Sequence, residues 1–276
     1  MANIGAKTAF YKVETSLSRA NNEVSKSMER LATGKANANA GDRSAFVAMG
    51  DTFRLDFAGT KAGIKGASVV MGYLETGMRV IDAGSALMAR LQELAVLGAN
   101  SSNTTADSAA INAEAEAIAD EFNRMMTKST YKGKDVFCTT ALEYNVSIGG
   151  RSAAMSFGIA RFAYTDLYSS GGNLVAKPSS GTSTVGALTI KIESVQTQLN
   201  TARVQAGSQY AAIESALNYT MDLTAQYELG FNTVNDVNFS METAHLAKNQ
   251  ILQQAATAML AQANRGQQGL LQLVQS

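Results

Sequence analysis

The last forty-two residues decide the fold, because they form a long stretch of helical periodicity with almost no charge. Residues 235–276 read NDVNFSMETAHLAKNQILQQAATAMLAQANRGQQGLLQLVQS, and no charged residue occurs between Asn249 and Asn264. Apolar residues recur three or four apart, and their neighbours widen the stripe: Leu252, Ala256, Met259, Leu260 and Ala263, with Ile251, Ala255 and Ala258. This spacing predicts a helix whose apolar face is wider than a two-stranded coiled-coil seam.

Most other positions in this stretch are Gln or Asn, which form hydrogen bonds without the desolvation cost of a charge. A helix that is apolar or amide-bearing on nearly every side is suited to burial on several sides. Because a terminal helix is seldom enclosed that way by its own domain, we expect other copies of the chain to cover it.

The run from Lys248 to Asn264, KNQILQQAATAMLAQAN, resembles the C-terminal signature of bacterial flagellin, the subunit of the flagellar filament. Ala256 departs from it, because the family usually has Gly there. The resemblance implies a structural protein that polymerises into the filament used for swimming motility. It also implies an extracellular location in the bacterial flagellum, reached through the flagellum's own export channel without a cleaved signal peptide.

The same resemblance implies the partners. They are other copies of the chain in a helical filament, the flagellar export apparatus and an export chaperone, the filament cap and the hook-junction proteins. The formal net charge is zero, so nothing points to nucleic acid or an anionic membrane surface. No apolar run approaches the roughly 18 residues of a transmembrane span, and the N-terminus lacks the apolar core of a secretory signal.

The N-terminal 33 residues carry a predicted coiled-coil seam. Its residues lie three or four apart: Phe10, Val13, Leu17, Ala20, Val24, Met28 and Leu31. An ordinary amphipathic helix on a globular core is the alternative. The following Leu31-Ala-Thr-Gly34 resembles the flagellin linker that joins the inner helix to the rod.

Two further stretches keep the same rhythm and predict a rod. One is a helix of fifty-five residues from Ser44, which would span roughly 80 Å. The other runs from Val185 to Val234 and is expected to pack antiparallel to it, beside a shorter helix over residues 107–128. Seven glycines between Gly50 and Gly84 imply either close contacts or local breaks, and the spacing does not distinguish these.

The run Ala89-Arg90-Leu91-Gln92-Glu93-Leu94 resembles a flagellin segment that lies on the rod between subunits. In some flagellins an innate immune receptor binds it. Arg90, Glu93 and Leu94, with Glu114 of the next helix, are therefore candidate rod-interface residues or receptor contacts.

The pattern changes to period two between residues 142 and 159. Leu142, Tyr144, Val146 and Ile148 alternate with polar residues, and a second alternating run follows Gly149-Gly150, which predicts a β-hairpin. Ser169 to Thr184 is rich in Ser, Thr and Gly and is expected to be a surface loop.

The chain is not expected to be an enzyme or to hold a cofactor or metal. His245 is the only histidine and Cys138 the only cysteine, and neither lies in a recognisable catalytic, metal or phosphate motif. We expect a packed or hydrogen-bonded role for His245. The alternatives to a filament subunit are a hook–filament junction protein and a secreted, monomeric coiled-coil binding module.

The predicted fold class is mainly α: a long antiparallel helical rod with coiled-coil seams, a small β-hairpin region, and paired N- and C-terminal helices. The predicted parts are residues 1–43 (inner helix and linker), 44–141 (rod), 142–183 (hairpin and loop), 184–234 (rod) and 235–276 (inner helix). Residues expected at the polymerisation interface lie on both terminal helices: Phe10, Leu17, Val24, Leu31, Ile251, Leu252, Ala255, Ala256, Met259 and Leu260.

Overall fold

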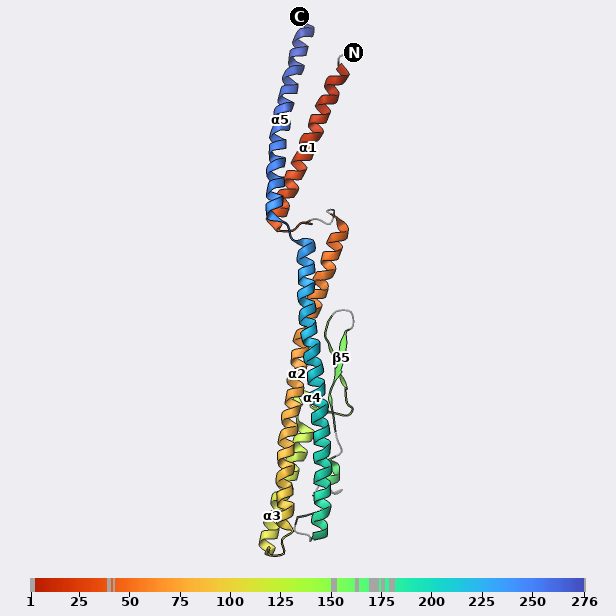
Figure 1. The fold of residues 1–276 in the computed structure, drawn as a ribbon, viewed down its shortest axis with the longest axis vertical. Helices are drawn as coiled ribbons and strands as arrows, with labels where there is room; N and C mark the ends of the chain where they lie inside the picture. The colour runs from red at the N-terminus through yellow and green to blue at the C-terminus, as the bar shows by residue number, and fades with distance from the viewer. Residues whose placement is uncertain are drawn as a thin grey trace. The chain divides into compact units, whose positions relative to one another are not determined.

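The computed structural model describes residues 3–38, 41, 43–149, 153–161, 164–168, 174, 177–178 and 182–275. Its helices are α1 (Asn3–Thr33), α2 (Ser44–Gly98), α3 (Thr105–Lys128), α4 (Thr182–Asn235) and α5 (Phe239–Gln275) (Figure 1). Short strands and a 3-10 turn lie between α3 and α4: β1 (Thr130–Tyr131), β2 (Lys134–Asp135), β3 (Phe137–Cys138), β4 (Tyr144–Ser147), β5 (Ala154–Phe157), β6 (Ile159–Ala160) and η1 (Thr165–Leu167). The predicted mainly α fold is confirmed.

The chain forms two compact units. The terminal unit comprises Met1–Leu55 and Gln226–Ser276, and the central unit comprises Asp56–Ala225. Helices α2 and α4 contribute residues to both. The five-part division made from the sequence stays a prediction.

In the central unit, α2 and α4 are antiparallel. Ser85 Oγ donates to Gln196 Oε1 at 3.0 Å, and Gln92 Nε2 donates to Thr189 Oγ1 at 3.2 Å, so the residue number rises along one helix as it falls along the other. A row seven residues apart is buried on α2: Thr60, Ala67, Leu74, Ile81, Met88 and Ala95. The facing residues of α4 are Leu188, Ile192, Val195, Leu199, Ala202, Ala206 and Ile213. The predicted antiparallel packing of these two stretches is confirmed, but Phe46 and Met49, which have the same spacing at the start of α2, are exposed in the terminal unit.

Helix α2 continues unbroken through its glycines, and several of them are close-contact positions. A Cβ on Gly63 would lie 1.9 Å from the carbonyl oxygen of Ile148, and one on Gly77 would lie 2.3 Å from Cδ1 of Ile159. Near α3, a Cβ on Gly84 would lie 3.1 Å from the Phe122 ring. The absent side chains therefore let the β region and α3 contact the helix backbone.

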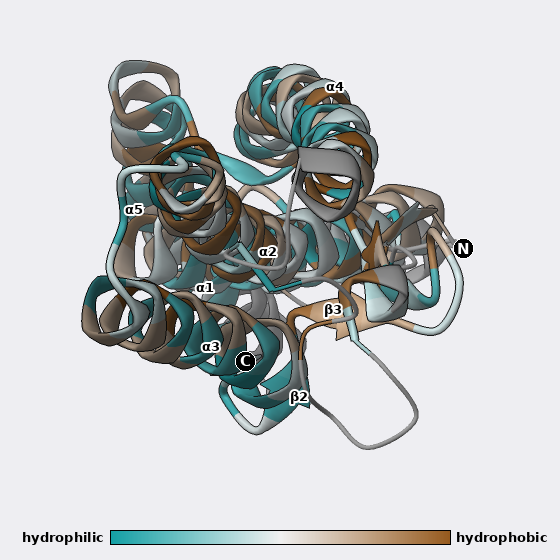
Figure 2. Ribbon diagram, turned by 90° about the horizontal axis from the view of Figure 1, so that it is seen from below, coloured by the Kyte–Doolittle hydropathy of each residue, from teal (hydrophilic) through white to brown (hydrophobic). Residues whose placement is uncertain are grey.

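The predicted hairpin is confirmed as β4 and β5. These strands are antiparallel with Tyr144 opposite Phe157 and Val146 opposite Met155. Leu142 is a correction: it has φ of 62° and is exposed, so it precedes the strand. Strand β3 pairs with β6 in parallel and is buried. Figure 2, which is coloured by hydropathy, shows that β3 is hydrophobic and β2 hydrophilic. The predicted loop Ser169–Thr184 lies largely outside the described residues, and its last residues belong to α4.

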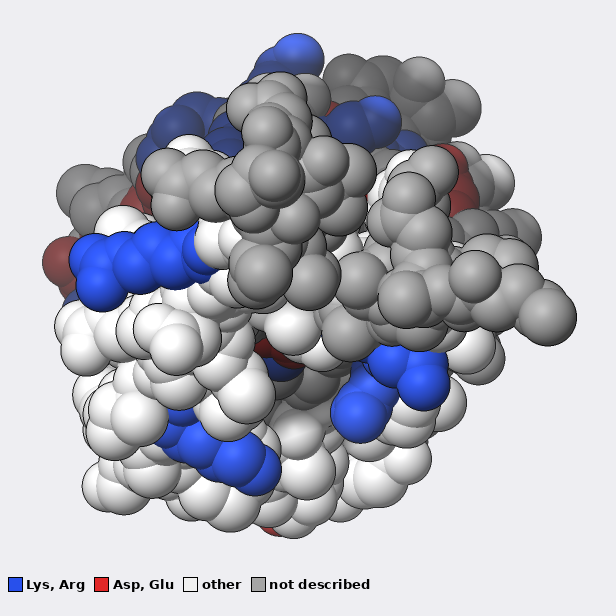
Figure 3. Space-filling model, turned by 90° about the horizontal axis from the view of Figure 1, so that it is seen from above, with Lys and Arg blue, Asp and Glu red and all other residues white. Residues whose placement is uncertain are grey.

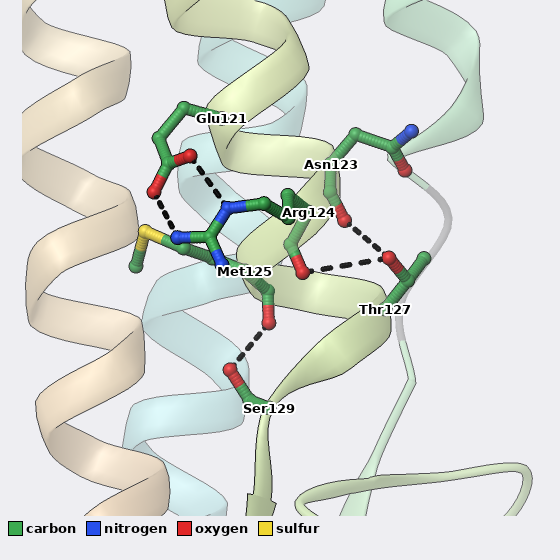
Figure 4. A network of polar contacts seen from close by, with 6 residues as sticks. All are labelled: Glu121, Asn123, Arg124, Met125, Thr127 and Ser129. Atoms are coloured by element: carbon green, nitrogen blue, oxygen red, sulfur yellow. Dashed lines mark hydrogen bonds and ion pairs between the residues drawn. The ribbon is translucent and has the colours of Figure 1, made fainter.

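Helix α3 has satisfied backbone groups at both ends. Thr104 is its N-cap, in a capping box with Asp107, so the helix begins two residues before the predicted start at 107. At the other end Thr127 Oγ1 donates to the carbonyl of Asn123 at 2.8 Å and Ser129 Oγ donates to the carbonyl of Met125 (Figure 4). Strand β1 begins at Thr130, directly after the C-cap residue Ser129.

Candidate assembly interface

Two linkers run side by side at the base of α1 and α5. Lys35 and Asp236 form an antiparallel bridge, in which the Ala36 N–H donates to the Asn235 carbonyl at 2.6 Å and the Val237 N–H to the Gly34 carbonyl at 3.1 Å. Gly34 has φ of 69° and its N–H donates to the Arg30 carbonyl, which is a left-handed end of α1. The helix α1 therefore ends where α5 begins, and the two pack antiparallel (Figure 1).

The face of α1 towards α5 is a regular seam. Its buried and half-buried residues are Phe10, Val13, Leu17, Ala20, Val24, Ser27 and Leu31. The prediction was wrong at one position: Met28 is 56% exposed, whereas Ser27 is only 3% exposed. Ser27 keeps the spacing of three and four residues. Its small polar side chain did not indicate a seam position, because the adjacent Met28 is larger and apolar.

The matching seam of α5 contains both apolar and polar residues: Glu242, Leu246, Asn249, Gln253, Ala256, Leu260 and Ala263. Polar contacts between described residues also join the helices. Arg30 Nη1 lies 3.9 Å from Glu242 Oε1, and Gln253 Nε2 donates to Asn21 Oδ1 at 2.7 Å. Sequence reasoning missed Asn21 and Gln253, although Gln253 falls on the seam spacing.

The predicted interface residues of α5 therefore fall into two groups. Ala256, 8% exposed, and the half-buried Leu260 face α1 of the same chain. The other four are exposed and form what we call the α5 outer face: Ile251 (66%), Leu252 (48%), Met259 (61%) and Ala255. The expected pairing of the two terminal helices accounts for Ala256 and Leu260, and contact of the predicted interface residues with neighbouring subunits stays a prediction.

Few charges occur near the α5 outer face. Lys248 and Arg265 are the charged residues nearest to it along the helix. In the view from above, much of the described surface is uncharged, with separate Lys and Arg side chains (Figure 3). An apolar, weakly charged face on one side of a paired helix is suited to contact with another protein surface.

A polar groove of about 420 Å³ lies beside the linkers, lined in part by Glu23, Arg30, Asp236, Glu242 and His245. A packed or hydrogen-bonded role was expected for His245; it is exposed in this groove, so the packed role is wrong and the hydrogen-bonded one stays a prediction. Across the described residues, no three His, Cys, Asp or Glu side chains are grouped to hold a metal ion. In that part of the chain, too, no helix combines the length and apolar character needed to cross a membrane.

The candidate rod residues form a surface ion-pair cluster. Arg90 donates from Nη1 to Glu93 at 2.8 Å and from Nη2 to Glu114 at 2.8 Å. Both hydrogen bonds raise the pKa of Arg90, and the bond to Glu93 has the larger effect. Exposed ion pairs of this kind stabilise a fold only slightly. Leu94 is 1% exposed and belongs to the core of the central unit, so it is not available to a partner in this structure.

Comparison with known proteins identifies the family. A family model described as the bacterial flagellin N-terminal helical region matches residues 4–141, and one described as the bacterial flagellin C-terminal helical region matches residues 188–274. A flagellin of Halalkalibacterium halodurans is 22% identical over 255 residues, covering 92% of each chain. The flagellar filament core protein flaB2 of Brachyspira hyodysenteriae is 27% identical over 270 residues, covering 92% of this chain and 93% of that one. The crystal structure of Bacillus cereus flagellin is 20% identical, with a TM-score of 0.47, and covers 56% of this chain and 88% of that one. Since the two family models together match most of its length, the chain belongs to the bacterial flagellin family.

Proposed function

We propose that this chain is the structural subunit of a bacterial flagellar filament and that it polymerises with copies of itself through the α5 outer face. Membership of the flagellin family and the similarity to a filament core protein support this function. The observation that carries the proposed interface is the exposure of Ile251, Leu252 and Met259 on a helix that already pairs with α1 through its adjoining face.

The exposed apolar area is large enough to contribute to assembly. Full burial of one such side chain contributes about 1.5–3 kcal/mol. Multiplying this by the fractions of Ile251, Leu252 and Met259 that are still exposed gives about 3–5 kcal/mol per subunit when another surface covers them. A filament repeats this contact in every subunit, so even part of it favours elongation.

The location and the other partners form part of the proposal. A filament subunit acts outside the cell, and we propose that it leaves through the flagellar export apparatus with an export chaperone and assembles under a filament cap above hook-junction proteins. The hook–filament junction alternative is not favoured, because proteins named as flagellins and filament core proteins match along nearly the whole chain.

The exposed residues Arg90, Glu93 and Glu114 are proposed as rod contacts. Their ion pairs lie on the surface of the central unit and link α2 to α3. A second subunit or an innate immune receptor could bind this cluster without disturbing the core, because Leu94, on the same turn of α2, is buried within the central unit.

The substitution Ile251→Asp tests the proposed interface. It places a charge on the α5 outer face, which would be desolvated on assembly at a cost of several kcal/mol. We expect a soluble chain with unchanged helical content that forms no filaments when seeded with parent filaments, as seen by electron microscopy. Ile251→Leu is the matched control and should polymerise.

Filaments of Ile251→Asp with normal yield would contradict the proposed interface. Ala256→Asp provides a contrast, because Ala256 faces α1. It should also disturb the pairing of α1 and α5 in the monomer, whereas Ile251→Asp should leave that pairing intact. A monomeric binding module would show no filaments from the parent chain itself.

A further inference from the structure

Gly158 lies where the chain leaves the β4–β5 hairpin and enters β6. Within the hairpin the Ile148 N–H donates to the Ala153 carbonyl at 2.8 Å, and in the same register Tyr144 lies opposite Phe157. Hydrogen-bonded pairs alternate with non-bonded pairs in an antiparallel ladder, so Tyr144 and Phe157 form a bonded pair. The next residue, Gly158, therefore falls at a non-bonded position, and the hairpin leaves its main-chain groups for another partner.

The side-chain amide of Gln209, on α4, supplies that partner. The Gly158 N–H donates to Gln209 Oε1 at 3.0 Å, and Gln209 Nε2 donates to the Gly158 carbonyl at 3.0 Å. The same carbonyl accepts a longer bond, of 3.5 Å, from the Leu142 N–H. An amide side chain has a donor end and an acceptor end, so it pairs with one residue as a neighbouring strand would.

The chain turns at Gly158 between two helices. Its φ is 146°, a conformation that favours glycine, and a Cβ would lie 3.2 Å from the Glu143 nitrogen and 3.4 Å from Cys138 Sγ. The next residue, Ile159, is fully buried against α2, where a Cβ on Gly77 would lie 2.3 Å from Ile159 Cδ1. The base of the hairpin thus meets α4 through main-chain groups and α2 through a side chain.

Gln209 occupies a helix position whose spacing is that of an apolar residue. It lies in a row of α4 whose other members are buried: Ala202, Ala206 and Ile213. Gln209 itself is half-buried. An amide withdrawn from water is favourable only where it is hydrogen-bonded, so this position is stabilised when Gly158 lies against it and destabilised when the hairpin lies elsewhere. An apolar side chain would fill the same space without distinguishing these arrangements.

We propose that Gln209 is the residue that positions the β4–β5 hairpin on α4. Its amide acts as a single strand residue bound to Gly158, and it holds the base of the hairpin by the main chain. The inference concerns the central unit of the single chain, and it holds whether or not the chain polymerises.

The substitution Gln209→Met separates positioning from the filling of space, because Met has a similar length and no amide. The assay is urea unfolding of the full-length monomer, followed by the near-ultraviolet circular dichroism of the central unit. Gln209→Met should raise the equilibrium constant for unfolding about ten-fold, as expected for the loss of two net hydrogen bonds. A side chain that only fills space would leave this constant unchanged or lower it on replacement by Met.

The substitution Gln209→Glu adds a pH profile. A protonated carboxyl can donate to the Gly158 carbonyl and accept from its N–H, whereas an ionised carboxylate cannot donate and faces the carbonyl oxygen. The pKa of the introduced carboxyl should therefore be higher in the folded chain than its ordinary value of about 4.3. Its stabilising effect is then present at low pH and lost as the pH rises through the folded-state pKa. Relative to the parent, the equilibrium constant for unfolding should rise about ten-fold between about pH 4 and about pH 8.

Gln205, one turn earlier on α4, provides matched controls because it is also half-buried but lies outside the buried row. Gln205→Met should change the equilibrium constant for unfolding less than about two-fold. Gln205→Glu introduces the same charge on the same helix and should show a weaker pH profile than Gln209→Glu.

The proposal is overturned if Gln209→Met changes the equilibrium constant for unfolding by less than about two-fold, or if the two Glu variants show the same pH profile. If Gln209→Met does not fold, Gln209→Glu decides. Unfolding like that of the parent near pH 4, with stability lost towards pH 8, supports the positioning role. Equal stability of Gln209→Glu relative to the parent at both pH values overturns it.

Discussion

Replacing Gly63 with Ala should destabilise the central unit, although Ala is the better helix former. In an open helix position this change stabilises by up to about 1 kcal/mol. At Gly63 the added Cβ would lie 1.9 Å from the Ile148 carbonyl oxygen and 2.2 Å from its carbon, both backbone atoms. Overpacking typically costs about 1–3 kcal/mol, and we expect a value near the upper end because backbone atoms cannot move aside as a flexible side chain can. After the gain in helix propensity is subtracted, the free energy of unfolding should fall by about 1–2 kcal/mol.

Gly66, three residues later on the same helix, is the matched control. Its added Cβ would lie 3.5 Å from a methyl group of Val146, which is an ordinary contact. Gly66→Ala should therefore raise the free energy of unfolding by about 1 kcal/mol. Gly207→Ala on α4, with nothing within 4 Å of the added atom, should do the same.

The assay is urea and thermal unfolding followed by near-ultraviolet circular dichroism. This signal reports the buried tyrosines of the central unit, such as Tyr73 and Tyr164. For a unit of this size, 1 kcal/mol shifts the midpoint temperature by about 2–4 °C. Shifts of the same sign and similar size for Gly63→Ala and Gly66→Ala would refute the reasoning that contact with the hairpin requires Gly63.

Two other predictions concern the central unit. Burial raises the pKa of Tyr73 and Tyr168 above the ordinary value of 10. Above pH 10 the unfolded chain therefore releases protons that the folded unit keeps, and the free energy of unfolding should fall as the pH rises. Below pH 10 these two tyrosines should cause no such loss. Urea unfolding in steps above pH 10 measures this slope, which Tyr73→Phe should reduce, and a flat profile would contradict it. Thr104→Ala removes the cap of α3 and should lower the free energy of unfolding by about 1 kcal/mol, whereas Ser108→Ala should lower it much less. Equal decreases for the two variants in chemical unfolding would show that Thr104 is not the dominant cap.

The sequence was sufficient to predict the helices and most of the positions that are buried between them. The row from Phe10 to Leu31 and the described part of the row from Val185 to Val234 were predicted from spacing and found buried or half-buried, with Met28 as the exception. The reason is that a period near 3.6 residues places apolar side chains on one side of a helix, and that side is removed from water in nearly any partner arrangement.

The candidate site was predictable only in part. The terminal helices and their apolar residues were identified, but Ala256 and Leu260 could not be separated from Ile251 and Leu252 by their spacing. Polar residues at seam positions were also overlooked, because Ser27, Asn249 and Gln253 resemble exposed residues when only hydrophobicity is considered.

The sequence by itself determined that the chain is mainly helical, where its seams lie, and that its C-terminal helix has more apolar surface than one partner needs. Only the tertiary structure decided what each face meets: α1 for Ala256, the hairpin for Gly63 and the inner core for Leu94. The physical reason is that hydrophobic burial has no direction, so periodicity marks a face as buried without naming its partner. Close approach at a glycine, and the hydrogen bond of one amide with another, depend on segments remote in the chain and appear only once these are folded together.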